Sequence, residues 1–287
     1  MENIQSAQLE MLPDDFNDRD GFIAEFLGED FKVSLPTVER DKDQVLLFEL
    51  DGKEISELKY RHFSVVMNSE RRMCFFSACN IDGLTSIRGV QRSSWKTDPR
   101  IDQKLQIIKE CYGDPPKFSR GHMTRKEDPI WGTLPLAQQA GADTFHVTNA
   151  TPQMQPFNAP VWLELENYAL ENARQDQMRI SVITGPVFSS DDPEKYGLKI
   201  PVDFFKIIAF IHDETKMLTA TGYTISQQDY FSPQEFIYGP LKTYQVSIST
   251  IEERTGLKFG NLSSVDPIKG QQLINLALGS VQDIRFI

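Results

Sequence analysis

Pairs of apolar segments joined by short polar turns constrain the fold of this chain more than any other feature. Residues 62–67 and 73–79 form one pair, and residues 203–211 and 217–225 form another. These segments are rich in β-branched and aromatic residues, which favour strands. Because strands that follow one another across a short turn pair antiparallel, the sequence predicts a sheet built from hairpins.

The other predicted elements place helices beside this sheet. The hydrophobic period predicts a helix over residues 158–177, a helix over 103–111 that stops at Gly113, and a short helix that stops at Gly256. Further strands are expected at residues 143–148, 179–187 and 244–248. We therefore predict an α+β fold with a central, mainly antiparallel sheet and flanking helices.

The first 44 residues differ from the rest of the chain. Residues 1–44 are acidic, contain Pro13 and Pro36, and show no sustained hydrophobic period. We predict that they form an acidic N-terminal arm, and that residues 45–287 form a single domain. Two roles are considered for the arm: it covers a sheet edge, or it restrains activity by occluding a basic cleft as a mimic of phosphate.

The distribution of charge matters more here than the net charge of −11. Residues 1–58 hold 16 acidic and 5 basic side chains, whereas residues 86–126 hold 10 basic and 4 acidic ones. A basic stretch can attract phosphate at Debye-length range even when the whole molecule is acidic. Charge alone favours a solvated surface of helix and loops.

Several classes of protein are disfavoured. The three cysteines, Cys74, Cys79 and Cys111, lack CxxC spacing, which argues against a disulfide framework and a thiolate zinc site. The sequence contains no GxxxxGK[ST] loop, no GxSxG elbow and no HExxH motif. We see no signal peptide and no apolar stretch near the roughly 20 residues that span a bilayer, so we expect a cytoplasmic protein without membrane contact.

His122 is the histidine whose neighbours point to chemistry. It follows Arg120 and Gly121 in a segment predicted to be a loop, where glycine allows close approach of the backbone. A neutral imidazole near pH 7 can accept a proton from water, and an adjacent Arg can serve the same phosphate. On these residues alone, a structural histidine is the favoured interpretation and a catalytic one the alternative.

A second group of polar residues lies at the start of the predicted helix 158–177. At about 100° per residue, Asn158, Trp162 and Glu166 share one side of that helix, which places an amide and a carboxylate on one face. Hard cations such as Mg²⁺ take oxygen ligands and keep several waters, so this pair suits a sparse magnesium site. The alternative is an ordinary helix start with Asn158 as the N-cap.

Taken together, these two groups resemble the signatures of the DNA/RNA non-specific endonuclease family, within the ββα-metal (His-Me finger) superfamily. The first family signature is Asp-Arg-Gly-His, and residues 119–122 read Ser-Arg-Gly-His. The second is Asn-x-x-Pro-Gln, then Asn, Trp and Leu-Glu; it matches residues 149–153, Asn158, Trp162 and residues 165–166. The resemblance extends over about residues 60–260 and implies a ββα-metal catalytic motif.

The resemblance implies a role for each matching residue. His122 is expected to be the general base, and Asn158 the direct protein ligand of one Mg²⁺, with Mn²⁺ as a substitute. Glu166 is expected to orient a water on the metal, Asn149 to position the phosphate or the His122 loop, and Arg120 to support charge beside the site. The implied reaction is metal-dependent hydrolysis of DNA or RNA with little sequence specificity, because backbone contacts carry no sequence information.

Two positions depart from the family pattern. Ser119 replaces the Asp of the first signature, and it can keep a hydrogen bond but not the negative charge. The family's transition-state Arg falls at Ser93, two residues before Trp95, and we expect Arg92 to replace it if the strand there has a bulge or a different register.

These departures leave alternatives open. One is a catalytically impaired or partner-activated nucleic-acid-binding protein of the same fold. Another is an interaction module whose acidic arm binds a basic partner. A homodimer and a regulatory partner are further expectations, alongside the DNA or RNA substrate.

Overall fold

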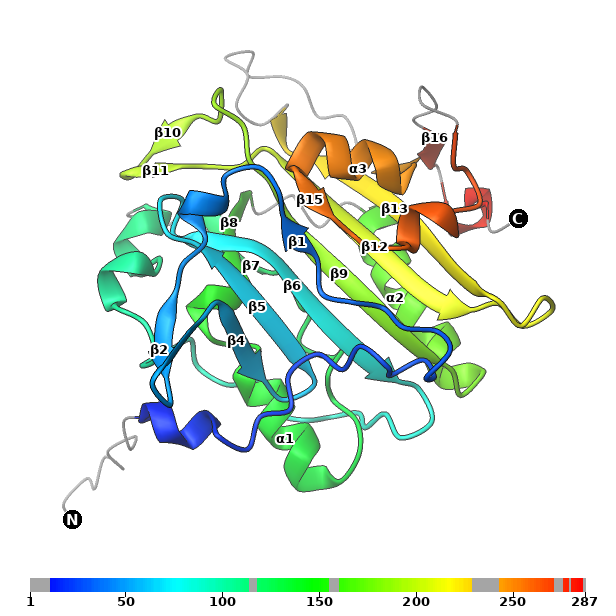
Figure 1. Cartoon of the computed structure of the whole chain (residues 1–287), viewed down its shortest axis with the longest axis horizontal. Helices are drawn as coiled ribbons and strands as arrows, with labels where there is room; N and C mark the ends of the chain where they lie inside the picture. Colours follow the sequence, from blue (N-terminus) through cyan, green and yellow to red (C-terminus); the bar gives the residue numbers. More distant parts are fainter. Residues whose placement is uncertain are drawn as a thin grey trace.

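An eight-stranded sheet forms the centre of the molecule (Figure 1). The computed structural model describes residues 11–113, 118–154, 160–228, 243–270, 276–278 and 280–285, without the side chains of residues 160–162 and 281. All neighbouring strands of the sheet are antiparallel, in the order β16-β14-β13-β12-β9-β6-β5-β4. The strands are β4 (Glu57–Tyr60), β5 (Phe63–Asn68), β6 (Met73–Asp82), β9 (Arg179–Val187), β12 (Asp203–Ile211), β13 (Leu218–Ser226), β14 (Thr243–Val246) and β16 (Leu276–Leu278).

Both predicted hairpins are confirmed. Strands β5 and β6 pair across residues 69–72, and β12 pairs with β13 over its full length, from Asp203 opposite Ser226 to Ile211 opposite Leu218. The predicted strand 179–187 is β9, which lies between the two hairpins and pairs with β6 and β12. The α+β class and the large antiparallel sheet are therefore confirmed.

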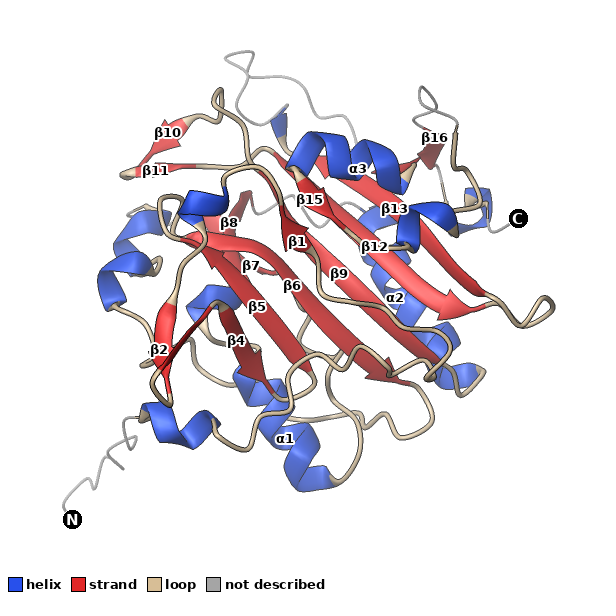
Figure 2. Cartoon of the chain, viewed as in Figure 1, coloured by secondary structure: helices blue, strands red, loops and turns tan. Residues whose placement is uncertain are grey.

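The described α-helices lie on the outside of the sheet, as Figure 2 shows. They are α1 (Leu134–Asp143), α2 (Pro160–Gln175) and α3 (Ile248–Thr255). Leu165 of α2 packs with Phe204 and Ile208 of β12 in one buried cluster, whereas Ile248 of α3 packs with Phe205 in another. Because side chains alternate along a strand, α2 and α3 cover opposite faces of the sheet. No helix in the described ranges is long and apolar enough to cross a membrane.

Two-stranded sheets lie outside the eight-stranded sheet. They are β1 (Thr37–Val38) with β15 (Leu257–Lys258), β2 (Phe48–Leu50) with β3 (Lys53–Ile55), β10 (Glu194–Lys195) with β11 (Leu198–Lys199), and β7 (Phe118–His122) with β8 (Ala150–Met154). The helix α1 lies between β7 and β8 in the chain, but these two strands pair and α2 follows β8, which matches the predicted ββα motif. The segment containing His122 was predicted to be a loop, which is wrong: it is a strand.

Two other predicted elements are also wrong. Residues 103–111 form two separate 3-10 turns, Gln103–Leu105 and Lys109–Tyr112, instead of one helix. The side chain of Gln106 bonds the backbone of Asp98 and Ile101, which competes with helical hydrogen bonding.

The predicted strand 143–148 is also absent. Asp143 ends α1, a helix that the sequence analysis missed, and Val147–Asn149 is a 3-10 turn. The imidazole of His146 and the amide of Asn149 bond the carbonyls of Asp143 and Thr144, so side chains rather than a strand ladder satisfy this backbone.

The described part of the N-terminal arm packs against the body. Phe22 and Val33 are buried in the core cluster that also contains Ile248. Arg19 forms an ion pair of 2.6 Å with Asp143, and the two side chains are only 6% and 1% exposed. Asp18 pairs with Arg61 at 3.1 Å. These ion pairs hold residues 11–44 against the body. The restraining role of the arm and the proposed domain division stay predictions.

Candidate active site

His122 ends strand β7, opposite Ala150 of β8. Its half-buried ring lies between the rings of Trp95 and Phe145, with centroids 4.6 and 4.9 Å away. Its Nε2 atom is buried and has no hydrogen-bond partner among the described residues. Burial lowers the pKa of His122 to about 3, helped by the positive charges of Arg92 and Lys126. The imidazole is therefore neutral at pH 7, the form that accepts a proton.

The loop after His122 is held by Asn149. Its amide oxygen accepts from the Thr124 backbone N–H at 2.8 Å, and its amide nitrogen donates to the carbonyls of Thr124 and Thr144 at 2.9 and 3.0 Å. Asn149 is fully buried. Of the two roles expected for Asn149, this geometry fits positioning of the His122 loop rather than contact with phosphate.

Three cationic side chains surround His122. The Arg120 guanidinium lies 5.1 Å from the ring of Tyr112 and 5.8 Å from the ring of Trp95, and its buried Nε lacks a described partner. The guanidinium of Arg92 lies 5.4 Å from the ring of Phe145. Lys126 donates to the Val90 carbonyl at 2.5 Å. The group formed by Arg92, Arg120 and Lys126, the basic group below, gives the site a positive field suited to phosphate.

Arg92 reaches this site without the strand bulge that the sequence analysis invoked. Residues 87–94 are irregular, and Arg92 is exposed. The bulge expectation is therefore wrong, because the segment has no strand ladder to shift. Ser119 also has a defined role: its hydroxyl donates to the carbonyl of Gln153 across the β7–β8 pair at 3.0 Å.

Glu166 lies on α2 and faces the sheet. Its Oε1 is 3.3 Å from Nζ of Lys206, and the Glu166 side chain is 17% exposed. Lys206 also donates to the hydroxyl of Thr184 at 2.9 Å. In the sheet register, Thr184 of β9 lies opposite both Lys206 of β12 and Ser77 of β6, and we call Ser77, Thr184 and Lys206 the polar row.

The polar row links the two halves of the site. At one end, Ser77 shares a hydrogen bond of 2.6 Å with Thr124, two residues after His122. At the other end, Lys206 pairs with Glu166. The polar row was not predicted from the sequence. Its one visible signal was Lys206 itself, a lone charge inside the apolar run 204–209.

The expected metal ligand, Asn158, lies outside the described residues, and so does the side chain of Trp162. Within the described ranges, no three His, Cys, Asp or Glu side chains converge to hold a metal ion. This finding disfavours a cage of carboxylates there. Mg²⁺ suits oxygen donors such as one amide and one carboxylate that acts through water. Glu166, which is paired with the ammonium group of Lys206, fits the role of that carboxylate.

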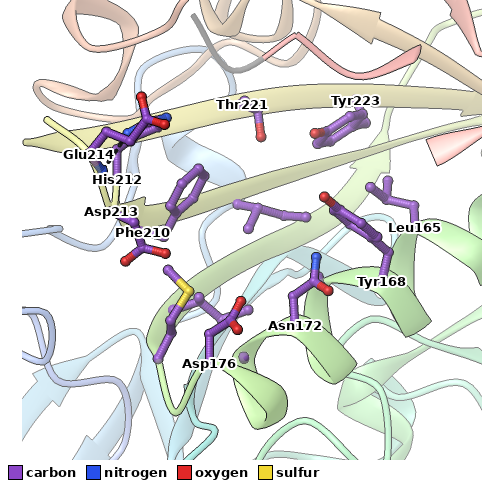
Figure 3. Close-up of a pocket in the computed structure, with 15 residues that line it drawn as sticks. Leu165, Tyr168, Asn172, Asp176, Phe210, His212, Asp213, Glu214, Thr221 and Tyr223 are labelled. Atoms are coloured by element: carbon purple, nitrogen blue, oxygen red, sulfur yellow. Dashed lines mark hydrogen bonds between the residues drawn. The ribbon is translucent and has the colours of Figure 1, made fainter. Parts of the chain in front are cut away.

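A separate cavity of about 280 Å³ lies between α2 and the hairpin β12–β13 (Figure 3). It is lined by apolar side chains and by Tyr168 and Tyr223, with Asp213 and Glu214 from the hairpin turn at one end. None of the predicted site residues lines it, although Leu165 beside Glu166 does. The candidate chemistry therefore lies outside this cavity.

The fold and these side chains together define an α+β protein with a ββα unit that presents a neutral histidine, a basic group and a carboxylate. A profile of the family described as DNA/RNA non-specific endonuclease matches residues 44–266. The chain belongs to this family.

Similar proteins agree with this assignment. The chain is 38% identical over 291 residues to the uncharacterized protein y4fB of Sinorhizobium fredii, covering 94% of this chain and 43% of that protein. It is 30% identical over 156 residues to human mitochondrial endonuclease G, covering 50% of this chain and 48% of that protein. The chain thus spans about half the length, or slightly less, of these curated relatives.

A solved structure gives the same fold. The structure described as the EndoG/EndoGI complex superposes with a TM-score of 0.54 at 19% identity, covering 71% of this chain and 84% of that chain. At this identity the likeness supports the fold alone.

Proposed function

We propose that this protein is an endonuclease that hydrolyses the phosphodiester bonds of DNA, RNA or both with little sequence specificity. The observation that carries this proposal is the neutral imidazole of His122, whose Nε2 has no described partner and which lies beside a basic group. The buried Nε2 of His146 is also unpaired within the described part of the chain, so it is the adjacent basic group that distinguishes His122. An unpaired acceptor beside cations suits a water attacking a phosphate.

Each residue then has a distinct task. His122 takes a proton from the attacking water. The basic group binds the phosphate and offsets the charge that develops on it. Asn149 holds the loop that carries His122, and Glu166 orients water on the leaving-group side. Since these groups face the backbone rather than base edges, cleavage carries little sequence information.

A divalent cation completes the proposed site. The family is metal-dependent in general, and we propose Mg²⁺, with Mn²⁺ as a substitute, held by Asn158 and through water by Glu166. When bound, the cation would neutralise charge on the phosphate and the leaving oxygen. A cytoplasmic location, a homodimer and a regulatory partner stay predictions.

The test is cleavage of supercoiled plasmid and of a long RNA by the purified chain with Mg²⁺, Mn²⁺ or EDTA. Wild-type protein is expected to degrade at least one substrate with metal and neither with EDTA. His122→Ala should lose this activity, whereas His212→Ala, directly after the end of β12, should keep it.

A second candidate function rests on Ser119, which lacks the charge of the family's Asp. It is a nucleic-acid-binding protein with impaired catalysis. Retarded migration of intact substrate in every metal condition would favour this candidate and contradict the nuclease.

A further inference from the structure

Lys206 is a buried charge in the centre of the sheet. Its residue exposure is 2%, and its strand neighbours Phe205 and Ile207 are fully buried. Burying an ammonium group is unfavourable unless the charge is paired. The charge of Lys206 therefore needs nearby hydrogen-bonding or negatively charged groups that compensate it.

The partners of Lys206 belong to the candidate site. Thr184 accepts from Nζ at 2.9 Å and fixes the ammonium on the sheet, while Glu166 lies 3.3 Å away on α2. Asp128, six residues after His122, is 6% exposed. Burial raises the pKa of Asp128 to about 6, the charge of Lys206 opposes that rise, and the charge of Glu166 adds to it. Lys206 is thus a cation whose field reaches two carboxylates.

This arrangement limits how Glu166 can meet a cation. A free carboxylate beside Mg²⁺ or Mn²⁺ is a strong direct ligand. Here the ammonium occupies one oxygen of Glu166 and also repels a second cation. We propose that Lys206 is a positioning residue that keeps Glu166 an outer carboxylate, one that meets the metal through water instead of binding it directly. This inference rests on the proposed metal-dependent function.

The test replaces Lys206 in the full chain and measures Mn²⁺ binding from the EPR signal of the free ion. Lys206→Met should tighten Mn²⁺ binding roughly three- to tenfold, because a nearby positive charge is lost and Glu166 is released. Turnover on plasmid should fall roughly 10- to 100-fold, because the carboxylate no longer orients water. Lys206→Arg should leave Mn²⁺ affinity within about twofold of wild type and retain more turnover.

Two further variants serve as controls. Lys258→Met removes an ion pair of similar length, 2.9 Å to Glu252, on the opposite face of the sheet, and should change neither Mn²⁺ affinity nor turnover. Lys206→Gln keeps a hydrogen-bond donor for Thr184 without the charge. It should tighten Mn²⁺ binding in the same direction, and it replaces the Met variant if that one does not fold.

The outcomes separate the two proposals. Unchanged or weaker Mn²⁺ binding in the folded Lys206 variants, or no Mn²⁺ binding by wild-type protein, would overturn the positioning role. Tighter Mn²⁺ binding in a protein that degrades no nucleic acid would support the role of Lys206 and contradict the nuclease. Tighter binding with slower turnover supports both.

Discussion

Gly121 is a position where the geometry of the site sets a measurable limit. A Cβ atom added there would lie 1.9 Å from Oε1, 2.0 Å from Cδ and 2.5 Å from Cγ of Gln153. Ordinary contact begins at 3.4 Å. Because Cγ overlaps as well as the terminal amide, rotation of the amide alone is not enough: the Gln153 side chain must change rotamer or strand β7 must move by about 1.5 Å. Gly121 has no positive φ, and the constraint is therefore steric rather than conformational.

The cost of Gly121→Ala follows from this overlap. Overpacking of this kind costs about 1–3 kcal/mol, and for a protein of this size each kcal/mol lowers Tm by roughly 2–4 °C. His122 is the next residue, so a shift of β7 displaces the proposed base. A displacement of about 1 Å in a catalytic group can cost about 10²-fold in rate. We expect kcat/KM to fall between about 10- and 100-fold, with a modest loss of Tm.

The assay compares Gly121→Ala, Gln153→Ala and the double variant by thermal melting and plasmid cleavage. Gln153→Ala keeps the backbone carbonyl that accepts from Ser119 and should remain close to wild type. The double variant should recover most of the lost activity, because the truncated side chain no longer meets the new methyl group. If Gly121→Ala alone melts and cleaves like the parent, or if the double variant shows no recovery, the steric reasoning is refuted.

Three other changes test separate contacts. Burial lowers the pKa of His146 from 6.5 to about 4. The free energy of unfolding that His146 contributes is therefore complete above pH 6.5 and falls by about 3 kcal/mol as the pH drops to 4. Urea titrations across this pH range should show the loss, and His146→Phe should make the loss smaller. Arg19→Met leaves Asp143 buried and unpaired by that Arg, and should cost about 3–5 kcal/mol in chemical denaturation, whereas Arg88→Met, on an exposed pair with Glu171, should cost under about 1 kcal/mol. Ser119→Asp restores the family residue, but an Asp carboxylate cannot donate to the Gln153 carbonyl. Melting should therefore show a loss of about 1–3 kcal/mol in the free energy of unfolding. A gain in plasmid cleavage would contradict the assignment of Ser119 to a structural hydrogen bond.

The sheet could be predicted from the sequence because its strands carry their own pattern. Strands β5, β6, β12 and β13 are apolar and are joined by short turns, so hydrophobic period and turn position both indicate hairpins. The elements that were predicted wrongly depend on side chains that capture backbone groups. Gln106 holds the segment after Asp98, and Asn149 holds Thr124 and Thr144. Such contacts have no period, so propensity alone does not find them.

The site was predictable to a different degree. The spacing of the two motifs brought His122, Asn149 and Glu166 to attention, and the structure places Asn149 just before β8, where its side chain holds the loop that follows His122. The sequence predicted that Gly121 allows a close approach to its backbone. The structure shows that the group which approaches is the Gln153 side chain. Lys206 was missed because its partners, Thr184 and Glu166, lie 22 and 40 residues away in the chain. The sheet register brings Thr184 to Lys206, and the packing of α2 on the sheet brings Glu166.

That register also explains how a site made from distant segments can keep one geometry. The His122 loop and α2 are separate in sequence, and each reaches the sheet through one polar contact, Thr124 to Ser77 and Glu166 to Lys206. Ser77 and Lys206 both lie opposite Thr184, one on each side of β9, so the distance between the two contacts is set by strand spacing. A one-residue slip of β9 would turn Thr184 to the opposite face and separate the two halves. The apolar packing that fixes the register, such as Val182 and Ile208 on this face, therefore also fixes the position of the proposed base relative to Glu166.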